Sequence, residues 1–179
     1  MSVLVQQVAI DASKEKVWEV LADFSGVANW APTISESRST TEANGGVGAE
    51  RSCEHEKMGT IYERIVAWEE GRGLSYDVID GLPFPMKSLN NIWEVRAQGD
   101  GALVTLTMDF GMKLGPLGFL PSIMARRLMS KEMRVTLAGP KQYVETGEVV
   151  ATTEQLAPTS IAAVDYAQAH QPEIQVVAK

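Results

Sequence analysis

The sequence predicts an α+β fold in which a curved antiparallel β-sheet of about seven strands surrounds a long C-terminal α-helix, with two short helices after the first strand. Three observations support this prediction. A segment rich in β-branched residues precedes a short helical pattern, several strand-like segments alternate with hairpin turns, and a long stretch near the C-terminus has apolar residues at helical spacing.

The N-terminal segment predicts one strand and then two short helices. Residues 2–10 are rich in β-branched and apolar side chains, which favour a strand. Ser13 is a suitable N-cap for the first helix. Residues 23–30 predict a second short helix or turn, which Pro32 ends because the residue before a proline disfavours helical geometry.

Six further strand-like segments follow, separated by residues that favour turns. The tripeptides Asn-Gly-Gly at 44–46 and Gly-Asp-Gly at 99–101 are strong hairpin signals. The last segment alternates apolar residues, from Val104 to Phe110, with threonine and aspartate, which predicts one buried and one solvated face. The expected strands span residues 34–41, 48–54, 58–68, 74–79, 88–97 and 102–112.

The long helix is expected from about Leu117 to Val144, where apolar residues recur at helical spacing. Pro116 suits the first turn of a helix, and the Gly139-Pro140 pair predicts a kink or break near the other end. Only this helix is long enough to cover the buried face of the sheet. The space between helix and sheet fills with side chains or stays open as a cavity.

The chain has 179 residues, enough for one domain with its own core, which we assign to residues 1–147. Residues 148–179 consist mostly of Ala, Thr, Val, Gln and Pro and have no lasting periodicity. We expect this segment to be largely disordered, with a weak helix around residues 161–169.

Charge and hydropathy exclude several classes of partner. The formal net charge is −7, and no basic patch suits nucleic acid or an anionic membrane surface. No apolar run is long enough for stable membrane insertion, and no signal peptide is visible. The single cysteine, Cys53, allows no internal disulfide, so we expect a cytoplasmic protein. Oligomeric state does not follow from the sequence.

Recognisable metal and nucleophile patterns are missing from the sequence. Cys-Glu-His-Glu at 53–56 places only two potential ligands on each face of a strand, fewer than a zinc site needs. A solvated strand end is the favoured interpretation of this motif. No serine lies in a nucleophile-elbow sequence, and no glycine-rich segment opens a helix as in phosphate-binding loops. We therefore expect no metal and no cofactor.

Four polar residues each fall in a separate apolar strand segment: Arg51, Glu63, Tyr76 and Asn91. Buried charges must be paired, so Arg51 and Glu63 are the natural pair across neighbouring strands. On the concave face this cluster would orient a carbonyl or hydroxyl group of a ligand. The alternative is a structural ion pair or a pair on the convex face. The pattern leaves both open, because Glu63 and Arg64 each alternate with apolar residues.

Large apolar side chains are the candidate walls of a cavity, and methionines among them would adapt to variable ligand shapes. The alternative for each residue is ordinary core packing. The Leu-Pro-Phe-Pro-Met segment at 82–86 would close the mouth of the cavity or, alternatively, form a stiff surface loop. The candidate walls are Trp30, Trp93, Met108, Phe110, Met112, Phe119, Met124 and Leu128.

Three segments resemble the SRPBCC superfamily of START-like, helix-grip proteins, and in particular its polyketide cyclase/dehydrase branch. They are VAIDASKEKVWEVLADFSGVANWAPTI, GVGAERSCEHEKMGTIYERIVAWEEGRGLSYDVIDGLPFP and GDGALVTLTMDF. The resemblance covers roughly residues 2–146. It implies a helix-grip fold and, because this fold carries many unrelated activities, leaves the function open.

Three hypotheses about function remain. The first is a binding protein for a small hydrophobic molecule such as a lipid, isoprenoid or polyketide. The second, which the resemblance implies, is a cyclase, aromatase or dehydratase with Glu63 as general base and Tyr76 or Arg51 polarising a carbonyl. Arg51 weakens that assignment, because a neighbouring cation lowers the pKa of a carboxyl group. The third is a protein-interaction module with a filled core.

Overall fold

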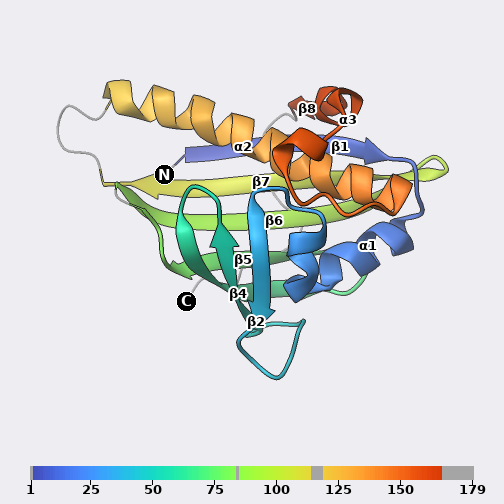
Figure 1. The fold of residues 1–179 in the computed structure, drawn as a ribbon, viewed down its shortest axis with the longest axis horizontal. Coiled ribbons are helices and arrows are strands. Elements are labelled where there is room, and N and C mark those ends of the chain that lie inside the picture. The colour runs from blue at the N-terminus through green and yellow to red at the C-terminus, as the bar shows by residue number, and fades with distance from the viewer. Residues whose placement is uncertain (1, 84, 114–118, 167–179) are drawn as a thin grey trace.

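A computed structural model of the chain describes residues 2–83, 85–113 and 119–166, without the side chains of 119–123, 125 and 166. Over these residues eight antiparallel strands form one sheet in the order β2-β3-β4-β5-β6-β7-β1-β8 (Figure 1). The seven expected strands are confirmed, and β8 is additional. The strands are β1 (Ser2–Ile10), β2 (Ile34–Ser39), β3 (Glu50–His55), β4 (Gly59–Glu69), β5 (Gly73–Asp80), β6 (Met86–Gln98), β7 (Gly101–Met112) and β8 (Val164–Tyr166).

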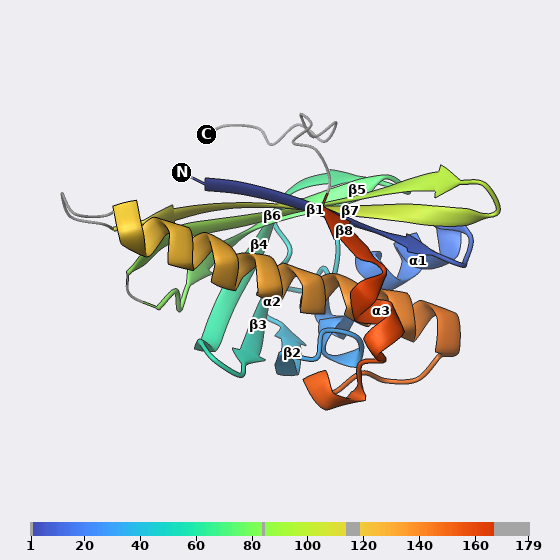
Figure 2. The ribbon, with the colours of Figure 1, turned by 90° about the horizontal axis from the view of Figure 1, so that it is seen from above.

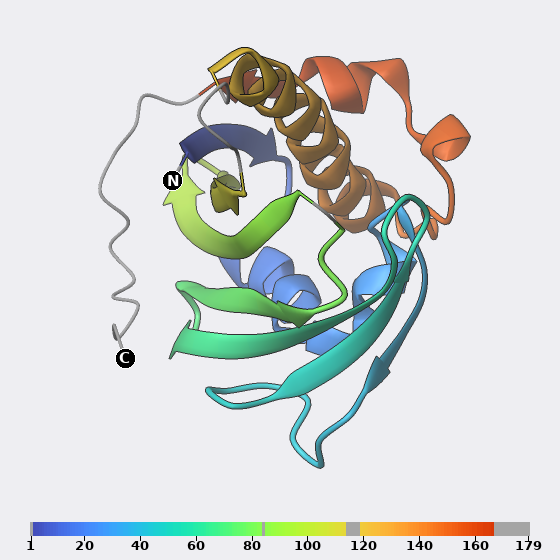
Figure 3. The same cartoon turned by 90° about the vertical axis from the view of Figure 1, so that its left-hand side faces the viewer.

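One long helix covers the concave face of the sheet, and the shorter helices lie at its margins. Figure 2 shows this helix, α2, running along the sheet, and Figure 3 shows the sheet curling so that α2 lies across its open side. The two expected helices after the first strand are also present. The helices are α1 (Lys14–Ala22), the 3-10 helix η1 (Phe24–Asn29), α2 (Phe119–Thr146), the 3-10 helix η2 (Thr153–Gln155) and α3 (Pro158–Ala162).

The curvature of the sheet has a local cause in its pairing. The register between β4 and β5 shifts twice, at Tyr62/Glu63 and at Ile65/Ala67, and bulges of this kind increase the twist of a strand. By contrast, β6 and β7 form one long hairpin that pairs from Met86↔Met112 to Gln98↔Gly101. The irregular half of the sheet bends around the space that the regular half and α2 enclose.

The β7 strand differs from its prediction in one respect. Its apolar residues, Leu106 among them, are buried against the core, as expected. Thr105 and Thr107, predicted to face solvent, are also buried. The reason is position: β7 lies inside the sheet between β6 and β1, so longer side chains of both neighbours flank its short threonines.

Helix α2 is fixed to the sheet by packing and by one buried side chain. The side chains of Met133, Leu137 and Ala138, which belong to α2, are fully buried. The buried Gln6 amide of β1 donates hydrogen bonds to the backbone oxygen of Ser130 at 3.0 Å and to its hydroxyl at 2.8 Å. These contacts fix the position of α2 over the sheet.

The Gly139-Pro140 pair does not break α2, which continues through Pro140 to Thr146. Gly139 has a different role. A Cβ atom at this position would lie 1.9 Å from the backbone oxygen of Trp30. Glycine is needed because the helix and the end of η1 approach each other this closely.

The segment after residue 147 is ordered over 148–166, which corrects the expectation of disorder for that part. Val150, Leu156 and Val164 are buried in the main core, and β8 pairs with β1 from Gln6↔Tyr166 to Val8↔Val164. Isolated apolar residues anchor this segment, so its sequence shows no periodicity. Residues 167–179 lie outside the described residues, and the domain boundary at 147 remains a prediction.

Candidate ligand cavity

A cavity of about 340 Å³ lies between the concave face of the sheet and α2, and it opens partly to solvent. Its wall is mostly apolar and comes from η1, the central strands, α2 and the 82–86 loop. Pro83, Pro85 and Met86 of that loop border the cavity. The interior is therefore not filled. The interaction-module hypothesis requires a filled core, so this cavity counts against it. The wall includes five methionines, namely Met58, Met86, Met108, Met112 and Met129.

Four polar residues predicted to cluster do lie together in this wall. Arg51 of β3 and Glu63 of β4 are register partners, and Arg51 Nε donates a 2.5 Å hydrogen bond to Glu63 Oε2. Tyr76 of β5 and Asn91 of β6 are likewise register partners. All four side chains are buried and border the cavity. The structure thus decides the face that the sequence left open, and Arg64 points to the other side, where it pairs with Glu50.

The Arg51 guanidinium is enclosed by aromatic rings and oxygen atoms. It lies 3.9 Å from the centroid of the Phe24 ring and 5.0 Å from that of Tyr76. Arg51 Nη1 donates a second hydrogen bond to the backbone oxygen of Phe24. Burial lowers the pKa of Arg51, but the charge of Glu63, its hydrogen bond to Arg51 and smaller contributions from Cys53 and Tyr76 together outweigh burial and leave the pKa raised. Arg51 is therefore a permanent cation whose charge Glu63 balances.

Two neighbours of this ion pair stay protonated. Burial raises the pKa of the Tyr76 hydroxyl, and the Glu63 charge raises it further. Burial likewise raises the pKa of the Cys53 thiol to about 11, and Cys53 Sγ lies 3.6 Å from Glu63 Oε2. At neutral pH both groups are uncharged hydrogen-bond donors beside the carboxylate of Glu63.

Among the polar groups of the described cavity wall, Trp30 Nε1 is buried without a hydrogen-bond partner, and Asn91 is a second candidate contact for a ligand. Its side chain is 6% exposed and borders the cavity. Within the described part of the chain, no side-chain hydrogen bond of Asn91 is formed. A primary amide offers two N–H donors and one oxygen acceptor, so Asn91 presents unused hydrogen-bonding capacity to the cavity.

The rim of the cavity carries three residues that the sequence analysis did not select. Lys57, in the turn between β3 and β4, forms an ion pair with Glu132 of α2 and so links the sheet to the helix. His55 Nδ1 accepts a 3.1 Å hydrogen bond from the Lys57 backbone N–H. Burial lowers the pKa of His55, so this imidazole is neutral at pH 7.

A sequence signal for His55 existed. It shares strand parity with Arg51 and Cys53, so it lies on the inner face rather than at a solvated strand end. Lys57 and Glu132 had no such signal, because their pairing depends on where α2 crosses the turn. No cluster of three or more His, Cys, Asp or Glu suited to a metal occurs among the residues described.

The predicted apolar walls divide into two groups. Trp30, Met108, Met112 and Leu128 border the cavity. Trp93 and Phe110 do not, because they are packed into the core. Trp93 lies edge to face with Trp30, with ring centroids 5.5 Å apart, and borders only a void of about 10 Å³.

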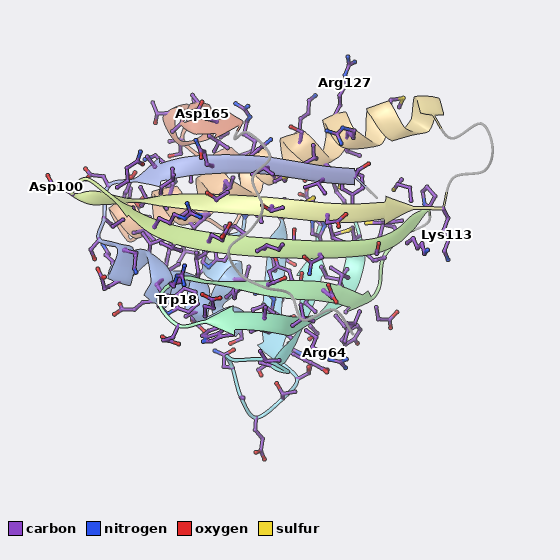
Figure 4. The ribbon with its side chains drawn as sticks, turned by 180° about the vertical axis from the view of Figure 1, so that it is seen from behind. Trp18, Arg64, Asp100, Lys113, Arg127 and Asp165 are labelled. Carbon is purple, nitrogen blue, oxygen red and sulfur yellow. The ribbon has the colours of Figure 1, made fainter. Side chains whose placement is uncertain are left out.

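The start of α2 does not match its prediction as a wall. Met124 is 73% exposed and does not border the cavity, and Leu128 lies at the rim, 53% exposed. Figure 4 shows Arg127 on the same stretch pointing away from the sheet. Helical apolar spacing over this stretch therefore does not bury Met124. The side chain of Phe119 lies outside the described residues.

Comparison with known families decides the assignment. The family described as "Polyketide cyclase / dehydrase and lipid transport" matches residues 1–145 of the chain. The chain belongs to this family. The match confirms the resemblance to the polyketide cyclase/dehydrase branch of the SRPBCC superfamily. A comparison with curated proteins gave no match.

Solved structures share the fold of this polyketide cyclase/dehydrase-family domain. TTHA0849 from Thermus thermophilus has a TM-score of 0.66 at 17% identity, over 80% of this chain and 97% of its own. XoxI from Bacillus cereus has a TM-score of 0.66 at 22% identity, over 80% and 96%. Ara h 8.0201 has a TM-score of 0.63 at 15% identity, over 80% and 97%. These likenesses establish the helix-grip fold alone.

Proposed function

We propose that this domain binds a small hydrophobic molecule, such as a lipid, an isoprenoid or a polyketide-like compound, in the cavity between the sheet and α2. The observation that carries the proposal is the cavity itself: about 340 Å³, mostly apolar, with a few buried polar groups in its wall. Ligand sites in proteins have this composition, and their volumes start at roughly 300 Å³.

The flexibility of the wall supports the proposal. Five thioether side chains border the cavity, and unbranched methionines repack around ligands of different shape at low cost. No helix in the described part of the chain is long and apolar enough to span a membrane.

The test is binding of Nile red, a neutral apolar dye whose fluorescence rises in apolar surroundings. Leu89→Trp and Met108→Trp each place a larger ring in the wall and should lower dye affinity at least tenfold. Met124→Trp is the matched control, because Met124 is exposed and outside the cavity. Saturable binding lost only in the wall variants supports the proposal, and no saturable binding of the dye to the wild-type chain would refute it.

A second candidate function is a cofactor-independent cyclase, aromatase or dehydratase. The observation that favours it is that Glu63, Arg51 and Tyr76 border the same apolar cavity, where a base and polarising donors would meet a substrate. The Arg51–Glu63 hydrogen bond counts against Glu63 as a base. With a polyketide-like substrate, Glu63→Gln should abolish turnover and preserve binding, and undiminished turnover would reject this role.

A further inference from the structure

We infer that the cavity selects uncharged ligands that carry one hydrogen-bonding group, such as an alcohol, ketone or ester, over carboxylates, and that Asn91 is the contact for that group. This inference rests on the proposed function, because it names the class of molecule that the cavity takes.

The first support is the balance of charge in the wall. The charged side chains of the described wall form two opposite pairs, Arg51 with Glu63 inside and Lys57 with Glu132 at the rim. His55, the remaining basic group there, is neutral because its burial lowers its pKa. The wall thus has no net charge to balance a buried anion.

The second support is the position of Arg51, the only buried cation in the described wall. Its Nε already contacts Glu63, and two aromatic rings flank its plane. A carboxylate that reached Arg51 would lie beside the Glu63 carboxylate. Like charges at such distances repel strongly in an apolar interior, and burying an unbalanced anion costs far more than burying a hydroxyl group.

The third support is the uncharged amide of Asn91 in the cavity wall. Asn91 lies across the β5–β6 pair from Tyr76, whose hydroxyl stays protonated. The amide both donates and accepts, so it can satisfy a carbonyl, a hydroxyl or an ester without any charge. Because Asn91 borders the cavity, a ligand group that displaces water from its amide must offer a hydrogen bond in place of that water.

The experiment displaces Nile red with three ten-carbon ligands: decanol, decanoate at pH 7.5 and decane. Decanol should bind at least tenfold more tightly than decanoate. Equal or tighter binding of decanoate overturns this inference and leaves the proposed function standing. Failure of all three ligands to displace bound dye would refute the proposed function as well.

Variants separate specific recognition from simple hydrophobic preference. Asn91→Leu should weaken decanol binding about tenfold and leave decane binding unaltered, since decane makes no hydrogen bond. Thr107→Val is the control, because it removes a buried hydroxyl outside the cavity wall. An equal loss for decanol and decane in Asn91→Leu would overturn the assignment of Asn91.

A charge variant tests the pairing argument directly. Glu132→Gln leaves the Lys57 ammonium at the exposed rim without its ion-pair partner. The ratio of decanol affinity to decanoate affinity should therefore fall at least threefold. Glu63→Gln should narrow it further by unbalancing Arg51, with circular dichroism to check that this buried variant folds. A ratio unchanged in Glu132→Gln and in folded Glu63→Gln would overturn the role of charge balance.

Discussion

Arg51 and Glu63 face each other across β3 and β4, with Arg51 Nε and Glu63 Oε2 2.5 Å apart and both side chains almost wholly buried. The pair lies in the wall of a largely apolar cavity, where each charge depends on the other. We therefore expect the loss of either partner alone to be costly, whatever the ligand.

Removing one partner of this pair should be strongly destabilising. Arg51→Met leaves the Glu63 carboxylate buried without its cation, which costs about 3–5 kcal/mol of unfolding free energy. The double variant Arg51→Met/Glu63→Leu should recover much of that loss, because no charge is left unpaired. Urea unfolding measures both. Additive losses in the double variant would contradict this interpretation of the pair.

Cys53 should react slowly and should contribute a pH dependence at alkaline pH. Burial raises its pKa to about 11, so the folded thiol stays protonated at pH 8 and should react with Ellman's reagent far more slowly than in urea. Between about pH 9 and 11 the unfolded thiol loses its proton first, so the Cys53 contribution to stability falls as pH rises. Rapid labelling of the folded chain would be incompatible with this burial.

Gly139→Ala should destabilise the domain by moving α2 away from η1. The added Cβ would meet the backbone oxygen of Trp30 at 1.9 Å, and backbone atoms cannot rotate aside. Overpacking of this kind costs about 1–3 kcal/mol. Gly45→Ala is the control, since its nearest neighbour is a Trp68 ring atom at 3.1 Å. Thermal unfolding of both variants checks the prediction, which fails if their midpoints are equal.

The segment after α2 should contribute to stability despite its unpatterned sequence. Leu156 is buried in the main core, and Leu156→Ala should cost about 2–5 kcal/mol of unfolding free energy. Val149→Ala, at a position 53% exposed, should change it by less than about 0.5 kcal/mol. Chemical denaturation measures the free energy of unfolding of both variants. An unchanged free energy of unfolding in Leu156→Ala would mean that this segment does not stabilise the core.

Local patterns predicted most of the fold and some of the residues that border the cavity. Strand parity and turn residues gave β1–β7, and helical spacing gave α1 and α2, because these signals depend on neighbours within a few residues. Pairing of Arg51 with Glu63 followed from the cost of an isolated buried charge. The ordered segment 148–166 escaped prediction because single apolar anchors such as Val150 produce no period.

The sequence alone determined the order of elements as far as α2, the family resemblance and the pairing of Arg51 with Glu63. Only the tertiary structure decided which face of β4 turns inward, that Lys57 meets Glu132 across the rim, and that Met124 lies outside the cavity. The physical reason is that these outcomes depend on the curvature of the sheet and on the distance between α2 and the sheet. Both are set by bulges and close contacts, such as Gly139 against Trp30, between residues far apart in the chain.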